Sequence, residues 1–424
     1  MDFRETIDKL GVVRREKAVD PFLEGSVISK EDPKSAWIAH VKDHDDWSMA
    51  GNVYSARSTL AMALGTDLQG ITDIMMKGAA DPQPVQIVDQ PVYYQSAEVE
   101  DIPIPTYYRG DGGPYFTSAI FHAGFQGKRN LSFHRMMHMR GNKFAVRVVP
   151  RHLKALINEA RGQGEDLPAV VSVGADPYSL LAGSTTSGYG DDELEVASSL
   201  RTMALGEPLK AFSPDGNDLL SPMGTELILT GRFVDERVPE GPFVDITSTY
   251  DHAGMDPGEP VFEVDRVIAR KDPIFHFLLP GGYEHYQMMG LPKEPSIKKA
   301  VGMVVPKVHG VRLTEGGCCW LHGVVSITPQ KQGDSKNAMM AAFTGHPSMK
   351  RVVIVNSDID IFDDAEVEWA VATRFQGDRD LLVLSGARGS TLDPSSPEPD
   401  RTTTKIGMDA TIPVGREEEF RKVD

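Results

Sequence analysis

The spacing of apolar residues divides the chain into a helical beginning, a middle part made mostly of strands, and a mixed end. Up to about residue 64, apolar side chains recur at helical spacing, as Ile7, Leu10 and Val13 do. Short apolar runs bounded by Gly and Pro follow and favour strands, with one helix near 192–205 among them. These strands are expected at 144–149, 169–173, 226–230 and 261–268. Their pattern predicts a barrel-like middle domain.

The last part of the chain alternates strand-like with helix-like segments, which is typical of an α/β layer. Strands are expected at 300–306, 323–328 and 351–356, and helices at 336–344 and 364–373. Breaks rich in Pro and Gly at 101–114 and 290–295 separate the three parts. We therefore predict a multidomain α/β (α+β) protein with an N-terminal α/β domain over 1–110, a barrel domain over 111–290 and a C-terminal α/β domain over 291–424.

Composition and charge are those of an ordinary globular protein and exclude several partners. The 424 residues are 40% hydrophobic and 25% charged, and the chain is too long for one compact core. A net charge of −17 repels a nucleic-acid backbone, and no cluster of Lys and Arg offsets it. No apolar run reaches the roughly 18 residues of a membrane helix, and the first residues lack a signal-peptide pattern. We therefore expect a cytoplasmic protein that binds neither nucleic acid nor membrane.

Three dispersed side chains are candidates for a metal site. Asn130 is expected in a turn, His152 just after a strand and Glu193 at the start of a helix. An amide oxygen, an imidazole and a carboxylate suit Mg²⁺ or Mn²⁺ with a phosphate completing the coordination sphere. Each residue taken singly also fits an ordinary role as a cap, a core histidine or a solvated acid, because the chain has no familiar metal motif.

A rigid acidic segment and one arginine form a second candidate. In 239–245 two prolines restrict the backbone around Glu240 and Asp245. Arg135 lies in the apolar, Met-rich segment 133–139 and, if buried, needs a carboxylate from Glu240, Asp245 or a substrate. The alternatives are an exposed turn with solvated charges and a surface arginine.

The Gly-rich segment 183–190 is a candidate phosphate site because it leads into a helix N-terminus. It matches neither the dinucleotide fingerprint nor the P-loop, so a plain flexible loop is the competing interpretation. The chain has no Gly-x-Ser-x-Gly elbow, and nucleophilic hydrolase chemistry therefore has little support.

In their order along the chain, these segments resemble the UbiD-like decarboxylase family. In that family an Asn precedes the catalytic Arg by five residues, a His segment and a helix beginning with Glu bind metal, and an acidic motif follows. The similar segments here are Asn130–Arg135, Arg151–Leu153, Asp192–Ala197 and Pro239–Asp245, followed by 355–360, 367–374, 391–394 and 407–411, which are similar to the family's C-terminal signatures.

The resemblance implies that the central domain is a split β-barrel that binds prenylated FMN. It further implies that Mn²⁺ or Mg²⁺ bridges protein and flavin phosphate, with K⁺ as an optional further ion. Arg135, Glu240 and Asp245 become the catalytic residues, and we expect Asp245 to be the proton donor. The metal ligands implied are Asn130, His152 and Glu193. The implied cofactor contacts are Asn130, Ser132, Phe133, His134, Arg151, His152, Ser184, Thr185 and Glu193.

Two departures from the family pattern concern the site. Asp245 stands where family members often have Glu, which shortens the acid by one methylene, and Arg151 replaces a common Gln. Contacts to the phosphate are therefore expected to differ here. If the substrate is itself phosphorylated, it needs an extra cationic contact, for which Lys143, Arg147 and Arg151 are candidates.

The resemblance to archaeal members implies a non-oxidative, reversible decarboxylation of trans-anhydromevalonate 5-phosphate to isopentenyl phosphate in an archaeal mevalonate route. The alternative substrate is an aromatic acid of the 4-hydroxybenzoate type. A non-catalytic flavin-binding or assembly protein is the alternative from another class. The partners implied are the unsaturated acid, a flavin prenyltransferase that supplies the cofactor, and copies of this chain in a homodimer or a hexamer of dimers, assembled with the help of a C-terminal tail.

Overall fold

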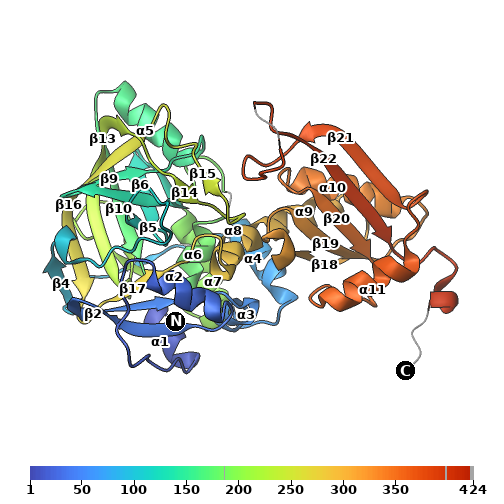
Figure 1. The fold of residues 1–424 in the computed structure, drawn as a ribbon, viewed down its shortest axis with the longest axis horizontal. Helices are drawn as coiled ribbons and strands as arrows, with labels where there is room; N and C mark the ends of the chain where they lie inside the picture. The colour runs from blue at the N-terminus through green and yellow to red at the C-terminus, as the bar shows by residue number, and fades with distance from the viewer. Residues whose placement is uncertain (186, 397–398, 421–424) are drawn as a thin grey trace. The chain divides into compact units, whose positions relative to one another are not determined.

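The computed structural model describes residues 1–185, 187–396 and 399–420, and the chain folds into two compact units. The first unit comprises Met1–Asp67 and Ile74–Met288, and the second comprises Leu68–Asp73 and Met289–Asp424. Figure 1 shows the elements of both units. No helix of the described residues is long and apolar enough to cross a membrane. The division into three domains, with borders at 110 and 290, stays a prediction.

The first unit is built on a nine-stranded sheet whose paired strands are all antiparallel. Along its main path the order is β5-β8-β9-β16-β13-β10-β6-β7, and β4 pairs with β16. The strands are β4 (Tyr94–Ala97), β5 (Tyr115–Phe116), β6 (Ile120–Phe125), β7 (Lys128–Phe133), β8 (Met136–Arg140), β9 (Lys143–Val146), β10 (Leu167–Val173), β13 (Leu227–Val238) and β16 (Glu259–Arg270). The four strands expected in the middle of the chain are confirmed as β9, β10, β13 and β16.

Both faces of this sheet are covered by apolar side chains. Along β10, Ala169 and Val171 enter the large aromatic core, whereas Val170 between them belongs to a smaller cluster with Tyr94 and Phe212. Because side chains alternate between the two faces of a strand, this separation shows that β10 is buried on both sides. A strand buried on both sides reads as a continuous apolar run, which is why it was recognisable in the sequence.

Smaller sheets and helices complete the first unit. The strands are β1 (Trp37–Val41), β2 (His44–Gly51), β3 (Gln86–Ile87), β11 (Lys210–Phe212), β12 (Ser221–Pro222), β14 (Phe243–Val244), β15 (Tyr250–Asp251) and β17 (Ile274–Phe277). The helices are α1 (Phe3–Lys9), α2 (Glu24–Glu31), α3 (Arg57–Ala63), α4 (Gly70–Ala80), α5 (His152–Gly162), α6 (Pro177–Ala182), α7 (Glu193–Leu205) and α8 (Tyr283–Gly290), with a short 3₁₀ turn η1 (Val99–Asp101). Helix α7 confirms the helix expected near 192–205. α4 and α8 run across the borders between the two units.

The expectation that helical structure dominates the first 64 residues holds at both ends, at α1 and α3, and is wrong in the middle. Ile7 is buried in α1, but Val13 lies outside any helix with 84% of its surface exposed. Residues 37–51 form the β1–β2 hairpin, and β2 pairs in parallel with β17, more than 200 residues later in the chain. Pairing with a distant strand decided the structure here, and local spacing cannot reveal such a partner.

The second unit is an α/β layer, as predicted for the end of the chain. Its sheet has the order β18-β19-β20-β22-β21, with parallel pairs at its centre and antiparallel pairs at both edges. Its elements are η2 (Leu291–Lys293), α9 (Glu294–Gly302), β18 (Val308–Leu313), η3 (Glu315–Gly317), β19 (His322–Ile327), α10 (Asp334–Gly345), β20 (Arg351–Val355), α11 (Asp364–Arg374), β21 (Leu381–Arg388), β22 (Thr402–Ala410) and η4 (Glu417–Phe420). The strand expected at 300–306 is wrong: α9 extends to Gly302, with Ile297 and Val301 buried at helical spacing.

Candidate active site

Arg135 lies between β7 and β8, and three carboxylates contact its guanidinium. Nε and Nη2 donate to the two oxygens of Glu240, each at 3.0 Å. Nη1 donates to Asp245 Oδ2 at 2.8 Å, and Nη2 also donates to Asp251 Oδ2 at 3.1 Å. Paired bonds of this kind fix the plane of a guanidinium as well as its position. Arg135 is therefore a buried, oriented cation with partners on three sides.

The acids reach Arg135 because a short hairpin folds the acidic segment back on itself. In the β14–β15 pair, Phe243 lies opposite Asp251, and Asp245 follows directly after β14. The ring of Phe243 lies 4.3 Å from the guanidinium carbon of Arg135, a cation–π contact that supports one face of the cation. The hairpin thus supplies two acids and an aromatic surface to a single arginine.

Glu240 is fully buried and has several partners besides Arg135. The Tyr115 hydroxyl donates to its Oε1 at 2.9 Å, and its backbone N–H donates to the Gly254 carbonyl at 3.0 Å. A Cβ atom on Gly254 would lie only 2.3 Å from Glu240 Oε2. Gly254 is therefore the residue that leaves space for this carboxylate to face Arg135.

The charges in this group affect one another's ionisation. Burial alone lowers the pKa of Arg135, but its contacts with Glu240 and Asp245 outweigh burial and hold that pKa above its ordinary value. Burial raises the pKa of Asp251, but Arg135 and the backbone N–H of Ala253 together lower it overall. Arg135 and Asp251 are therefore both charged near neutral pH, and Glu240 shares the Nη2 group of Arg135 with Asp251.

A second group of polar residues lies on β7 and at the start of α7. Asn130 Nδ2 lies 3.3 and 3.2 Å from the two oxygens of Glu193, and the Leu131 N–H donates to Glu193 Oε2 at 2.7 Å. Glu193 is the first residue of α7, as expected, and Asp192 caps that helix by accepting from the Leu194 N–H. Asn130 lies within β7 and not in a turn, so that expectation is wrong; pairing with β6 made its surroundings a strand.

Proton positions in this second group favour a cation beside Glu193. Burial lowers the pKa of His134 to about 4, so the ring is neutral at pH 7, and its Nδ1 must donate to the Arg147 carbonyl at 2.9 Å. Its Nε2 then accepts from the Ser132 hydroxyl at 2.9 Å. The Ser132 hydroxyl has then used its only hydrogen, so the Asn130 amide atom 2.9 Å away must be a donor. Rotating that amide by a half-turn exchanges its oxygen and nitrogen and places Nδ2 beside Ser132. This half-turn points Asn130 Oδ1 at the Glu193 carboxylate.

Two oxygens facing each other in this way need a shared proton or a bound cation. Burial raises the pKa of Glu193 to about 7, which outweighs the lowering by the Leu131 N–H, and a cation would relieve this unfavourable burial. Within the described residues, no three His, Cys, Asp or Glu side chains are grouped as metal ligands. The donor chemistry therefore fits a metal ion held through the Asn130 amide oxygen and completed by atoms from outside the protein.

The other residues expected to contact the cofactor form no hydrogen bond with the Asn130–Glu193 pair within the described residues. His152 begins α5, and its ring contacts the Tyr189 ring, with centroids 5.5 Å apart; within the described residues it forms no hydrogen bond or ion pair with Asn130 or Glu193. Arg151 is the exposed residue before that helix. Ser184 and Thr185 donate to the carbonyls of Leu180 and Ala182 at the end of α6.

The Gly-rich segment 183–190 flanks β7 and is not a free loop. The Phe133 N–H donates to the Gly183 carbonyl at 3.3 Å, and Arg129 forms a β-bridge with Gly190 at the other end. Residue 186 lies outside the described residues. Both ends of the segment therefore lie beside the strand that carries Asn130, Ser132 and Phe133.

Sequence reasoning missed four residues around Arg135: Asp251, Tyr115, Phe243 and His285. Burial lowers the pKa of His285, which interacts electrostatically with Asp245 and Arg135, so this histidine is neutral at pH 7. Its Nδ1 accepts from the Gly281 N–H at 3.1 Å. In the sequence, Asp251 was marked only by its place six residues after Asp245. That spacing points to a shared site only when the register of the β14–β15 hairpin is known.

The chain resembles known proteins along its whole length. Residues 77–283 match the 3-octaprenyl-4-hydroxybenzoate carboxy-lyase Rift-related domain, and residues 286–410 match the C-terminal domain of the same proteins. An anhydromevalonate phosphate decarboxylase from Methanothermobacter thermautotrophicus is 42% identical over 99% of both chains.

Two solved structures have the same fold. The UbiD-class enzyme HmfF from Pelotomaculum thermopropionicum in complex with FMN superposes with a TM-score of 0.93 at 33% identity, covering 100% of this chain and 97% of that one. An evolved dimeric form of HmfF in complex with prFMN gives 0.88 at 30% identity, covering 100% and 96%. With two family domains spanning most of its length and relatives above 30% identity from end to end, the chain belongs to the UbiD family of decarboxylases.

Proposed function

We propose that this protein decarboxylates trans-anhydromevalonate 5-phosphate, an α,β-unsaturated acid, to isopentenyl phosphate in a non-oxidative, reversible reaction. The observation that carries the proposal is the contact of one buried Arg135 with Glu240, Asp245 and Asp251. The choice of substrate is supported by the 42% identity, over the whole chain, to a relative named for that activity. A cytoplasmic location, assembly as a homo-oligomer and supply of cofactor by a flavin prenyltransferase belong to the same proposal.

The cofactor in this proposal is prenylated FMN, tied to the protein by Mn²⁺ or Mg²⁺. When bound, it would accept the electron pair that remains on the alkene carbon as CO₂ leaves. Asn130, His152 and Glu193 would hold the ion, and the neighbouring Ser132, Phe133, His134, Arg151, Ser184 and Thr185 would contact the flavin. The raised pKa of Glu193 supports this choice, because burial disfavours the charge of that carboxylate and a bound cation would offset this cost.

The two acids nearest Arg135 are suited to different roles. Glu240 is fully buried and accepts three hydrogen bonds, two from Arg135 and one from Tyr115, so it holds the guanidinium in place. Asp245 has 16% of its side chain exposed and one bond from Arg135, so it can reach a substrate. We assign positioning to Glu240 and proton donation to Asp245.

Proton uptake by Asp245 also prepares Arg135 for the substrate. A neutral Asp245 no longer needs Nη1 of Arg135, and that N–H becomes available to the carboxylate of the incoming acid. The bond between the carboxyl carbon and the alkene carbon then breaks, CO₂ departs, and the alkene carbon receives the proton of Asp245. Neutral His285, buried beside this pair, adds no competing charge.

The proposal predicts dependence on a prenylated flavin. Protein expressed in a host with little flavin prenyltransferase should be inactive with the phosphorylated acid, and co-expression of that enzyme should restore CO₂ release. Mass spectrometry of the bound flavin gives the independent readout. Equal activity with unmodified FMN would refute the cofactor, whereas turnover of 4-hydroxybenzoate in place of the phosphorylated acid would refute the substrate.

The Gly254→Ala variant tests whether the position of Glu240 matters. The new methyl group would overlap Glu240 Oε2 and its backbone oxygen, so the carboxylate must move away from Arg135. We expect kcat to fall about tenfold or more, because small displacements of positioning groups are costly for catalysis. Gly162→Ala is the matched control, since its Cβ would meet no atom within 4 Å. A Gly254→Ala protein with unchanged kcat would remove Glu240 from the proposed mechanism.

A further inference from the structure

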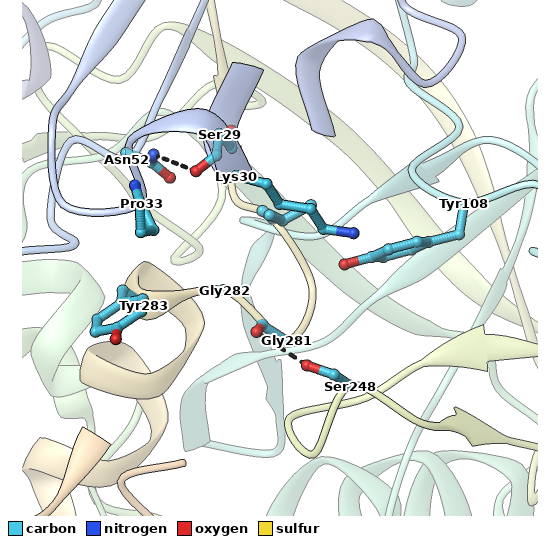
Figure 2. Close-up of a pocket in the computed structure, with 10 residues that line it drawn as sticks. Ser29, Lys30, Pro33, Asn52, Tyr108, Ser248, Gly281, Gly282 and Tyr283 are labelled. Atoms are coloured by element: carbon cyan, nitrogen blue, oxygen red, sulfur yellow. Dashed lines mark hydrogen bonds between the residues drawn. The ribbon is translucent and has the colours of Figure 1, made fainter. Parts of the chain in front are cut away.

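A cavity of about 220 Å³ lies in the first unit, beside the hairpin that carries Asp245. A water molecule occupies about 30 Å³ of liquid, so the space holds several waters or a small polar group. Figure 2 shows Lys30 extending across it from α2 toward Tyr108, with Tyr283 on the opposite side and Gly281 below. The lining residues are Ser29, Lys30, Pro33, Asn52, Tyr108, Ser248, Leu279, Gly281, Gly282 and Tyr283.

One lysine and no acid line the cavity, and a second lysine, Lys34, contacts one of the lining residues. None of the lining residues is a carboxylate, although the whole chain carries 61 Asp and Glu against 44 Lys and Arg. The Lys30 ammonium lies 4.3 Å from the centre of the Tyr108 ring, and the Lys34 ammonium lies 5.0 Å from that of Tyr283. Neither lysine forms an ion pair with any described residue. The positive charge of Lys30, which no lining acid offsets, therefore favours binding of an anion in the cavity.

Two of the three cationic candidates from the sequence are already paired with carboxylates, and the third, Arg151, is the exposed residue before α5. Lys143 Nζ lies 2.7 Å from Glu236, and Arg147 is paired with Glu259. A substrate anion would have to displace these acids, whereas Lys30 lies over an aromatic ring and pairs with no carboxylate of the described residues. Phosphate binding at Lys30 and Lys34 thus costs no existing ion pair.

The walls of the cavity are held in place and are shared with the proposed proton donor. The Ser248 N–H donates to the Asp245 carbonyl at 2.9 Å, and its hydroxyl donates to the Gly281 carbonyl at 3.2 Å. On the other side, Asn52 donates to the carbonyls of Ser29 and Asp32 and so fixes the end of α2. A ligand group in this cavity would lie one short turn away from Asp245.

We propose that this cavity binds the phosphate group of the substrate, with Lys30 as its main cation and Lys34 as the second. The inference rests on the proposed function, since it names the contact that selects a phosphorylated acid. A carboxylate at Arg135 and a phosphate at Lys30 would orient the acid by its two charged ends, with Asp245 between them. Arg135 and Lys30 would thus each bind one charged group of the substrate.

The test compares two substrates in the holoenzyme: the phosphorylated acid and the same acid without its phosphate. In Lys30→Met, KM for the phosphorylated acid should rise about 10- to 100-fold, the scale of one lost hydrogen bond between charged groups. The value of kcat/KM for the unphosphorylated acid should stay within about twofold of the parent. Lys30→Arg should recover part of the loss because guanidinium also binds phosphate.

Lys17→Met is the matched control, since Lys17 is an exposed lysine of the same region that pairs with Glu24 and does not line the cavity. It should change neither KM. An unchanged KM in Lys30→Met, or an equal loss for both acids, would overturn the proposal. If the parent enzyme turns over neither acid, the proposed function fails, and calorimetric titration with inorganic phosphate decides about the cavity: binding that is weaker in Lys30→Met supports the site, and equal binding refutes it.

Discussion

Replacing Asp245 with asparagine should lower kcat by about 10²-fold or more, the scale expected for loss of a general acid. Asparagine keeps the shape of the side chain and an oxygen that can accept from Arg135 Nη1, but it has no transferable proton. Flavin content should stay near that of the parent, because Asp245 makes no contact with the Asn130–Glu193 group. Measurement of kcat together with flavin absorbance separates these two effects.

Two further variants make that experiment decisive. Asp235→Asn removes an 88% exposed acid of β13 and should have no effect on kcat. Arg135→Lys should be as severe as Asp245→Asn, since an ammonium cannot satisfy both oxygens of Glu240 and also reach Asp245. Parent-like turnover in Asp245→Asn would transfer the donor role to Glu240 or water, and loss of flavin would assign Asp245 to cofactor binding instead.

Glu193→Gln should lose flavin and divalent ion together, leaving a nearly inactive protein. The amide cannot supply the negative charge that attracts a cation, although it can keep the hydrogen bond from the Leu131 N–H. One ion that joins protein and phosphate explains a joint loss, whereas separate sites would be lost separately. Metal analysis and flavin absorbance on the same purified sample measure both contents.

The controls for this second experiment lie on the same elements. Glu195→Gln removes an exposed acid from the same helical turn of α7 and should retain both groups. His152→Ala should resemble Glu193→Gln if the ring of His152 turns from Tyr189 toward the ion. Full occupancy by metal and flavin in Glu193→Gln would refute the metal site. If only His152→Ala keeps full occupancy, His152 is not a ligand of the ion.

The sequence identified the candidate functional segments more reliably than it predicted their secondary structure. Strands buried on both faces, such as β10 and β13, left continuous apolar runs, and α7 had both a cap and a helical period. The β1–β2 hairpin and α9 were misread because short apolar runs fit helix and strand equally until a distant partner decides. Asn130 was placed in a turn for a different reason: its hairpin turns at Gln126 and Gly127, which have positive φ, and Asn130 already lies in the strand opposite Ala123.

The third acid at Arg135 shows a different limit of sequence reasoning. Glu240 and Asp245 stand in one rigid segment, so their joint contact with an arginine was a reasonable expectation. Asp251 reaches the same guanidinium only through the register of β14 and β15, which places it opposite Phe243. A register set by two residue pairs has no signature in a single sequence.

The β14–β15 hairpin has a consequence for how substrate preference can diverge within such a fold. Its two acids at Arg135 are tethered, but the turn between them, residues 246–249, carries Ser248 into the wall of the cavity. Substitutions in that turn can therefore reshape the proposed phosphate cavity while Asp245, the proposed proton donor, keeps its place. The residue proposed to donate the proton and the turn that shapes the cavity are neighbours in the chain but can be substituted separately. A protein of this fold can therefore change the acid that it prefers while the contacts at Arg135 stay the same.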